Sequence, residues 1–563
     1  MKPAHEKYIP FVPLKMTRRA WPDRELKAPP VWCSVDLRDG NQALIDPMNV
    51  REKLELFHTM VDIGVKEIEV GFPSASETEY EFIRTLIEGG HIPDDVTIQV
   101  LVQAREHLIR RTFEAIDGAK HVIFHFYNST STLQRKVVFH TDVEGVKKIA
   151  VDAARLIREL SQPALDAGMD LRYEYSPESF MGTEMDAAVE ICQAVIEAIG
   201  ATPEHKVILN LPTTVENCMP NYFADEIEYF ISRLPGRDRA IISLHPHNDR
   251  GEGVATAELG LLAGAERVEA TLFGNGERTG NVDMVTLALN LYTQGVDPKL
   301  DFSDINKIRD VYERVTKMKI GERQPYVGEL VFTAFSGSHQ DAINKGTRYM
   351  EESGTEYWEV PYLPIDPADV GRQYEPIIRI NSQSGKGGSA FVMQHSFGFD
   401  LPKAMHPEFG HIVQVETDRV GKELKPDAIY DLFKAHYIDA VKPYQLVQHS
   451  FAEFTDEEGH SHVTFAGTIR HTDTVFQVQG SGNGPIDAFF NAIHGQKMDR
   501  FTFIDYKEHA VKQGSDSQAV AYIHLQDENG RDWFGVGMSH NINLAPLKGI
   551  LSAINRAVSH DGK

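Results

Sequence analysis

The chain has 563 residues, a length that favours roughly two to four domains. Apolar residues make up 42% of it and charged residues 25%, which is the composition of an ordinary globular protein. The formal net charge of −25 argues against nucleic acid and anionic membranes as partners, because both attract clustered positive charge.

The first 30 residues and the cysteines bear on where the protein works. Residues 1–30 are basic and rich in proline, lack the apolar run of a secretion signal and include acidic residues, so we expect an ordered N-terminal arm. Cys33, Cys192 and Cys218 are far apart and form no metal-binding or redox spacing, which indicates a reducing, cytoplasmic location. No window approaches the roughly 18 apolar residues of a membrane-spanning helix, so we expect no membrane partner.

From residue 31 to residue 300, short β-branched runs alternate with longer helical patterns. The runs are VWCSVD, KEIEVGF, VTIQVLV, HVIFHFYN, DLRYEYS, KVILNLP, AIISLHPH and RVEATLF. Gly64 and Gly200 follow two of the helical patterns, as left-handed caps would. Eight strand–helix units with nearly continuous apolar strands predict an α/β fold, a (β/α)8 TIM barrel. A doubly wound open sheet is the alternative, and the absence of GxGxxG after the first strand disfavours it.

The remaining residues lose this alternation. Residues 301–425 contain clusters of Pro, Gly and Asp, which predict small linker subdomains with helices. In residues 426–563, TVFQVQGSGNGPIDAFFNAI and DWFGVGMSHNINLAPLKGILSAINRA each combine a strand, a glycine-containing bend and a helix. These two halves predict an α+β module with an internal duplication.

The loops after the strands form the active face of a (β/α)8 barrel, so the residues just beyond the eight runs are candidates for chemistry. Arg38 and Asp39 follow the first run, and Asn281 follows the eighth. His245 and His247 end the seventh run and point to one side, because side chains alternate along a strand. Two imidazoles, a carboxylate and a carboxamide oxygen predict a site for Mg²⁺, Mn²⁺ or Zn²⁺.

The histidine pair has two other interpretations. Packed or surface histidines would need no common partner, but the position at the seventh strand end, with Asp39 at the first, disfavours this. An amidohydrolase barrel would carry HxH after the first strand and Asp after the eighth, which is the reverse of the order here. Other strand ends carry candidate binding or acid–base groups, namely His125, Glu174, Ser176, Glu178, Asn210 and Thr214.

Five motifs in order resemble one family. LRDGNQA, EIEVGFP, LHPHNDRGEG, GNGERTGN and SGSHQDAINKG together are similar to the longer form of the 2-isopropylmalate synthases, metal-dependent barrels that make carbon–carbon bonds beside a carboxylate. LRDGNQALIDP and VPYLPIDPADVGRQYEPIIRINSQSGKGG point to the longer form, and the resemblance covers essentially the whole chain. It implies condensation of acetyl-CoA with 2-oxoisovalerate to (2S)-2-isopropylmalate and CoA, the first committed step of leucine biosynthesis.

Related functions stay open at this point. Citramalate or homocitrate synthesis would need only a different pocket for the side chain of the keto acid. A catalytically inactive, leucine-sensing paralogue is a further alternative, although the complete set of candidate metal ligands argues against it. A lyase that runs such chemistry backwards is disfavoured, because a duplicated C-terminal module is unusual for a lyase.

The resemblance also implies roles for single residues. Asp39, His245, His247 and Asn281 would bind the divalent metal, most simply Mg²⁺, and Arg38 would stabilise the enolate of acetyl-CoA. Glu178 is one candidate for proton transfer, and the others are His339 and Tyr362 from the linker region of the partner subunit. The substrate pocket would be lined by Arg38, His125, Ser176 and Thr214.

The C-terminal module resembles the leucine-binding regulatory domain of the family. Leucine bound there would inhibit the barrel at a distance. The duplicated module, packed against a second copy, implies a homodimer. The turns GSGNGP and GVGMSHNIN would form the floor of the effector pockets through Gly480, Gly482, Gly484, Gly535 and Gly537.

Overall fold

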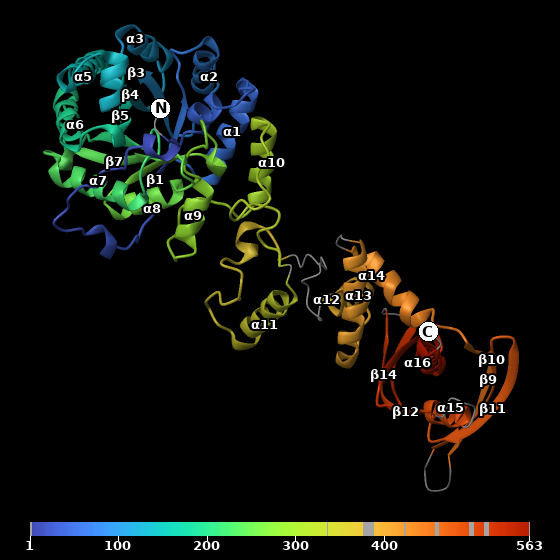
Figure 1. The fold of residues 1–563 in the computed structure, drawn as a ribbon. Helices are drawn as coiled ribbons and strands as arrows, with labels where there is room; N and C mark the ends of the chain where they lie inside the picture. Colours follow the sequence, from blue (N-terminus) through green and yellow to red (C-terminus); the bar gives the residue numbers. More distant parts are fainter. Residues whose placement is uncertain are drawn as a thin grey trace. The chain divides into compact units, whose positions relative to one another are not determined.

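The computed structural model describes residues 3–334, 336–374, 388–420, 424–455, 461–494, 500–511 and 517–561. Residues 375–387, part of the segment that points to the longer form of the family, lie outside the described residues. The chain divides into two compact units, Met1–Phe332 with Pro364–Tyr374, and Thr333–Leu363 with Glu375–Lys563. Figure 1 follows the chain from blue at the N-terminus to red at the C-terminus.

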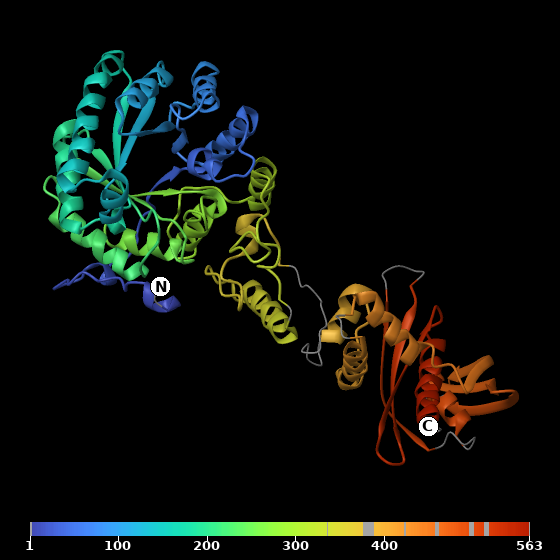
Figure 2. The same cartoon turned by 45° about the horizontal axis from the view of Figure 1, so that its top comes forward.

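The first unit contains a closed barrel of eight parallel strands in sequential order, which confirms the predicted (β/α)8 fold. The last strand pairs with the first, with Val31 opposite Arg267, and this pairing closes the barrel. Figure 2 shows the helices surrounding the strands. The strands are β1 Val31–Ser34, β2 Glu67–Gly71, β3 Thr97–Gln103, β4 His121–Ser129, β5 Asp170–Glu178, β6 Val207–Pro212, β7 Ala240–His245 and β8 Arg267–Ala270.

Helix ends in the barrel follow the local sequence signals. α1 begins with a capping box between Asn49 and Glu52, and it ends at Gly64 with φ 105°. Gly200, with φ 77°, ends α6 in the same way, so both predicted caps are confirmed. The helices are α1 Val50–Ile63, α2 Glu77–Glu88, α3 Glu106–Ala115, α4 Thr132–Gln134, α5 Val143–Asp166, α6 Met185–Ile199, α7 Pro220–Arg233, α8 Gly253–Leu262, α9 Met284–Tyr292 and α10 Ile305–Thr316.

The N-terminal arm lies against the outside of the barrel. Arg19 donates two hydrogen bonds of 2.7 Å to the carboxylate of Asp225 on α7, and the indole of Trp21 donates a third of 2.9 Å. The backbone N–H of Ala20 donates to Glu228 on the same helix at 2.9 Å. These contacts give the proline-rich arm a defined position on α7.

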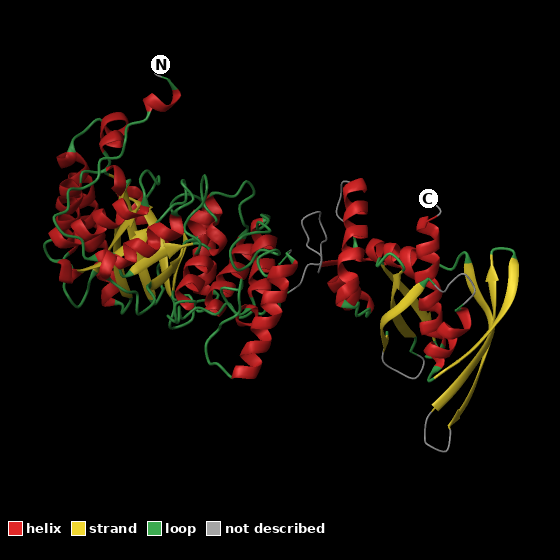
Figure 3. Cartoon of the chain, turned by 60° about the horizontal axis from the view of Figure 1, so that its bottom comes forward, coloured by secondary structure: helices red, strands yellow, loops and turns green. Residues whose placement is uncertain are grey.

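The second unit begins with helices and ends in a duplicated module, as the sequence predicts. Each half consists of a three-stranded antiparallel sheet followed by a helix, and Figure 3 shows helices between the two groups of strands. The helices before the strands of the module are α11 Gly337–Ser353, α12 Gly388–Phe397, α13 His406–Val420 and α14 Pro426–Phe433. The module comprises β9 Tyr444–Thr455, β10 Ser461–His471, β11 Thr474–Gly482, α15 Pro485–Ile493, β12 Phe501–Ala510, β13 Ala519–Asp527, β14 Asp532–Ser539 and α16 Leu544–Asp561.

Two apolar cores lie in the part of the second unit that follows α11. One core joins the two halves of the module through residues such as Phe465, Phe489 and Leu547. The other core packs α12, α13 and α14 against β13 and β14, with Tyr522 and Val536 on the strands. Both faces of β13 and β14 are therefore covered. None of the described helices combines the length and the apolar character that crossing a bilayer demands.

Candidate active site

A cavity of about 810 Å³ lies at the carboxyl ends of the barrel strands. Residues that follow different strands line it, as the barrel architecture requires of an active site. Most of the barrel residues predicted to act in the site border this one cavity: Arg38, Asp39, His125, Ser176, Glu178, Thr214, His245 and His247.

A π-helical turn, Asp36–Gly40, follows β1 and directs Arg38 and Asp39 into the barrel. The carboxylate of Asp36 is buried, accepts a hydrogen bond from the backbone N–H of Leu272 at 3.1 Å, and thereby ties this turn to the end of β8. Burial raises the pKa of Asp36 to about 7, although the Leu272 N–H favours the charged form.

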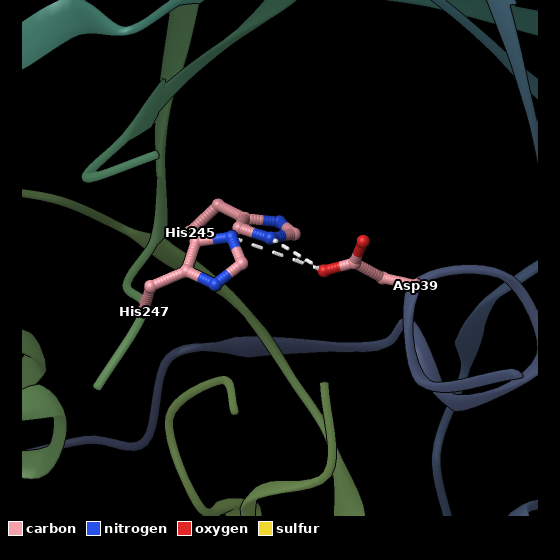
Figure 4. A group of neighbouring side chains, drawn as sticks. All are labelled: Asp39, His245 and His247. Carbon is pink, nitrogen blue, oxygen red and sulfur yellow. Dashed lines mark hydrogen bonds and ion pairs between the residues drawn. The ribbon is translucent and has the colours of Figure 1, made fainter. Parts of the chain in front are cut away.

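Asp39, His245 and His247 come together at the mouth of the barrel. The Nε2 atom of His245 lies 3.2 Å from Oδ2 of Asp39, and that of His247 lies 4.0 Å from the same oxygen. Figure 4 shows both imidazole rings turned toward this carboxylate. One nitrogen or oxygen atom from each residue lies within 4.8 Å of the others, and all three residues are buried. This spacing suits three ligands of one cation.

Asn281 adds a fourth polar side chain to this cluster. Its amide nitrogen donates to Oδ2 of Asp39 at 2.9 Å, and Asn281 is 1% exposed. Its carbonyl oxygen is buried and has no hydrogen-bond partner among the described residues. An unpartnered buried acceptor is costly, and rotation of the carboxamide by about 180° would bring this oxygen to the place of the nitrogen beside Asp39, where it could bind a cation. The donor set therefore fits a divalent metal.

Glu269, which the sequence analysis missed, orients His245. Its carboxylate lies 2.6 Å from Nδ1 of His245, so Nδ1 donates the proton and Nε2 is left to face Asp39. Histidine ligands of metals in proteins are held by a carboxylate in this manner. Glu269 itself accepts hydrogen bonds from Gln99 at 2.7 Å and Asn210 at 2.9 Å.

The pKa values of His245 and His247 are shifted in opposite directions. Burial by itself lowers the pKa of His245, but hydrogen bonds to Asp39 and Glu269 outweigh it and raise the pKa to about 9. Burial and the neighbouring charge of His245 lower the pKa of His247 to about 4. Burial opposes the charge of Asp39, yet Arg38 and His245 hold its pKa well below the ordinary value. The cluster therefore keeps its carboxylate and one neutral imidazole at neutral pH.

Arg38 lies between two carboxylates. Its Nη1 atom donates to Oδ1 of Asp39 at 2.7 Å, and its Nε atom donates to Glu69. The side chain is 11% exposed and borders the cavity. These bonds fix a permanent positive charge beside the cluster of Asp39, His245 and His247.

His125 and Ser176 form the wall next to this charge. Nδ1 of His125 lies 2.7 Å from Glu69, and Nε2 lies 2.8 Å from Oγ of Ser176. Glu69, His125 and Glu269 also have the spacing of a metal site. Gln99, however, donates to both glutamates at 2.7 Å. The group of Glu69, His125 and Glu269 is therefore a hydrogen-bonded network, and it supports the group of Asp39, His245 and His247 through Glu269.

The remaining barrel candidates differ in position. Glu178 is half-buried at the cavity and accepts a hydrogen bond from the hydroxyl of Ser129. The hydroxyl of Thr214 accepts the backbone N–H of Ser179 at 2.8 Å. Glu174 is fully buried and does not border the cavity, and burial raises its pKa well above the ordinary value despite the opposing charge of Arg267.

His339 and Tyr362 belong to the second unit. Their rings stack with centroids 4.1 Å apart, and Tyr362 is 61% exposed with φ 65°. The structure thus brings these two predicted residues together in one exposed pair. Their action at the barrel of a partner subunit stays a prediction.

Most of the glycines predicted to form the floor of the effector pockets lie close to a helix of the module. A Cβ atom on Gly535 would lie 2.1 Å from the carbonyl oxygen of Gly549 on α16, and one on Gly537 would lie 2.0 Å from that of Ala545. A Cβ atom on Gly480 or Gly482 would lie 2.4 or 2.5 Å from the backbone of α15, whereas one on Gly484 would have open space around it. Their role in effector binding stays a prediction.

A separate cavity of about 650 Å³ lies in the second unit, and none of these five glycines lines it. It combines charged, aromatic and apolar side chains. Glu508 has a carboxylate oxygen that is buried without a hydrogen-bond partner among the described residues. The lining is Tyr506, Glu508, His509, Ala510, Ser517, Ala519, His540 and Ile542.

Three family models match the chain in succession. Residues 29–312 match the HMGL-like model, residues 329–394 match "alpha-isopropylmalate synthase, post-catalytic domain-like", and residues 423–558 match the LeuA allosteric (dimerisation) domain. A 2-isopropylmalate synthase of Clostridium acetobutylicum is 53% identical over 98% of this chain and 99% of its own length. Those of Mesorhizobium japonicum and Pseudomonas putida are each 52% identical, over 100% and 99% of this chain and 100% and 98% of their own lengths.

Proposed function

Because the chain belongs to the family of 2-isopropylmalate synthases, we propose that it condenses acetyl-CoA with 2-oxoisovalerate to (2S)-2-isopropylmalate and CoA. The observation that carries the proposal is the convergence of Asp39, His245 and His247 on one point of the barrel cavity. A cytoplasmic location and the first committed step of leucine biosynthesis are part of the same proposal.

We assign Asp39, His245, His247 and Asn281 to a divalent cation, most simply Mg²⁺, with Mn²⁺ or Zn²⁺ as alternatives. When bound, such a cation orients the 2-oxo acid and polarises its keto group as a Lewis acid. The hydrogen bond from Nδ1 of His245 to Glu269 supports this assignment, because it directs Nε2 toward Asp39 and toward the place that the cation would occupy.

Arg38 stabilises negative charge on oxygen in this proposal. The methyl group of acetyl-CoA loses a proton, and the resulting enolate carbon forms a bond to the keto carbon of the second substrate. Charge appears first on the thioester oxygen and then on the former keto oxygen. The Arg38 guanidinium, held by Asp39 and Glu69, is in place before either charge develops.

Two groups are candidates for the proton transfers. Glu178 borders the cavity, and the hydroxyl of Ser129 holds its carboxylate there. His339 and Tyr362 are the alternative, contributed by a partner subunit as a stacked pair. His125, Ser176 and Thr214 would contact the keto acid, and water would then cleave the thioester to release CoA.

We further propose that leucine is the effector and that the protein is a homodimer. The match of residues 423–558 to an allosteric (dimerisation) domain supports both. The cavity of the second unit suits an amino acid, because the Glu508 oxygen that has no partner among the described residues can accept a hydrogen bond from an ammonium group, while Ile542 offers an apolar contact. His509 and His540 are the candidates for contact with the carboxylate.

A panel of 2-oxo acids tests the proposal directly. Thiol release from acetyl-CoA is measured with 2-oxoisovalerate, pyruvate and 2-oxoglutarate, each with and without a chelator. We expect the highest kcat/KM with 2-oxoisovalerate, loss of turnover with chelator, and inhibition by added leucine. Preference for pyruvate or 2-oxoglutarate would instead indicate citramalate or homocitrate synthesis, and metal-dependent binding without turnover would indicate an inactive sensor.

A further inference from the structure

Arg278 lies where the loops after β6, β7 and β8 meet. It comes from the loop after β8 and borders the barrel cavity. Its Nη2 atom donates to the backbone carbonyl of Thr214, after β6, at 2.6 Å. Its Nε and Nη2 atoms donate to the carboxylate of Asp249, after β7, at 2.7 and 3.1 Å. One guanidinium therefore connects three strand-end loops.

The carboxylate of Asp249 extends this connection back to the loop after β6. Its Oδ2 atom accepts the backbone N–H of Glu216 at 2.9 Å. Arg278 and Asp249 together thus hold the backbone on both sides of Val215. Thr214 borders the cavity, and its hydroxyl accepts a hydrogen bond from the backbone N–H of Ser179.

The backbone of Arg278 has an uncommon conformation. Its φ is 58°, in the left-handed region that non-glycine residues rarely adopt. A residue persists there only when its surroundings fix it, and the loops of functional sites are where this is most common. The side chain of Arg278 is 38% exposed and that of Asp249 is 16% exposed, so solvent partly screens this ion pair.

We propose that Arg278 is a positioning residue for the 2-oxo acid, which it serves by holding the Thr214 loop at the cavity wall beside His247. This inference rests on the proposed function, which places Thr214 in the pocket of the keto acid. The guanidinium of Arg278 holds the loop of Thr214. Asp39 and Arg38 hold each other, and Ser129 holds Glu178, so these residues do not depend on Arg278 for their hydrogen bonds. Loss of Arg278 should therefore weaken keto-acid binding selectively.

The test compares Arg278→Asn with Arg237→Gln. Asparagine tolerates a left-handed φ, so the first variant removes the guanidinium without new backbone strain. Arg237 makes similar bonds, to the carbonyl of Ala240 at 2.6 Å and to Glu266 at 2.6 Å, but at the amino end of β7. We expect Arg278→Asn to raise KM for 2-oxoisovalerate about tenfold or more, with KM for acetyl-CoA within about twofold of wild type. Arg237→Gln should change neither value.

Two further measurements distinguish loss of the connection between Arg278 and the Thr214 loop, called the clamp below, from a general defect of the active site. Hydrogen exchange of the backbone amides in residues 213–216 should become faster in Arg278→Asn and stay unchanged in Arg237→Gln. Asp249→Asn should act in the same direction, and the effects of the two substitutions should be less than additive in the double variant, because both remove the Arg278–Asp249 ion pair. Unchanged exchange, or equal rises in both KM values, would overturn the proposal. If the wild type fails to turn over 2-oxoisovalerate, the proposed function fails, and the exchange measurement still tests the clamp.

Discussion

At the scale of single residues, Glu226 on α7 is a buried acid whose charge the fold opposes. It is 5% exposed, and its Oε2 atom has no hydrogen-bond partner among the described residues. Burial, and then the charge of Asp225, raise its pKa from 4.5 to about 8. The folded protein therefore keeps a proton that the unfolded chain releases. Stability is highest below the unfolded pKa and declines as pH rises through the folded one.

Glu226→Gln should remove this decline. We expect the unfolding free energy of the variant, relative to wild type, to increase by on the order of 1 kcal/mol per pH unit between about pH 5 and pH 8. Urea denaturation at several pH values measures the difference. Glu81→Gln, at an exposed glutamate on α2, is the control and should show no such trend. A constant difference across this range would mean that Glu226 is already ionised in the folded state.

Residue patterns predict the residues that would bind the cation better than the residues that hold those side chains in place. Two histidines in the pattern HxH share a face of any strand, so their convergence follows from local geometry. Glu269 meets His245 only through the pairing of β7 with β8, and Gln99 joins the network from β3. The one available signal was a carboxylate within the apolar run RVEATLF, since a buried charge requires a partner.

At the scale of elements, the glycines of β14 set the distance between α16 and its sheet. Gly535→Ala would place a methyl group 2.1 Å from a carbonyl oxygen of α16, so the helix must shift. We expect a loss of about 1–3 kcal/mol in the stability of the second unit. Gly484→Ala is the matched control, because Gly484 has extended backbone and open space.

Thermal unfolding and limited proteolysis of the full chain compare these two variants. The expected pattern is earlier cleavage within residues 424–561 for Gly535→Ala, with the barrel unaffected. Leucine inhibition, measured in parallel, tests the predicted effector role of the glycines. Weakened inhibition in Gly484→Ala with normal stability would favour a direct role, whereas loss in Gly535→Ala alone would reflect packing.

The order and type of the elements could be predicted, and several boundaries could not. Eight apolar runs and their helices follow from periodicity, as the closed barrel shows. The run RVEATLF predicts a strand to residue 273, yet β8 ends at Ala270 and Phe273 turns to φ 56°. The π-helical turn Asp36–Gly40 likewise depends on the Asp36 contact with Leu272, more than 200 positions away in sequence. Such ends are fixed by tertiary contacts, which local patterns do not contain.

At the scale of the whole molecule, the predicted chemistry is divided between the two units. Asp39, His245 and His247 belong to the first unit, and the exposed pair of His339 and Tyr362 belongs to the second. An exposed aromatic pair with one residue at positive φ is unusual for a merely structural contact. If the pair acts on a partner's barrel, each active site requires residues from two chains.

Mixed dimers test this arrangement. Asp39→Ala removes a metal ligand from the barrel, and His339→Ala removes the exposed pair, so each variant alone should be nearly inactive. In a heterodimer, the intact barrel of the His339→Ala chain would meet the intact His339 of the Asp39→Ala chain. Coexpression with random pairing should then restore about a quarter of the wild-type activity, because half of the dimers carry one complete site of two. Action within one chain predicts no recovery at all, since every chain in the mixture then lacks one essential group. The control is coexpression of Asp39→Ala with His245→Ala, two lesions of the same barrel site, which should stay inactive if the pair acts between chains or within one.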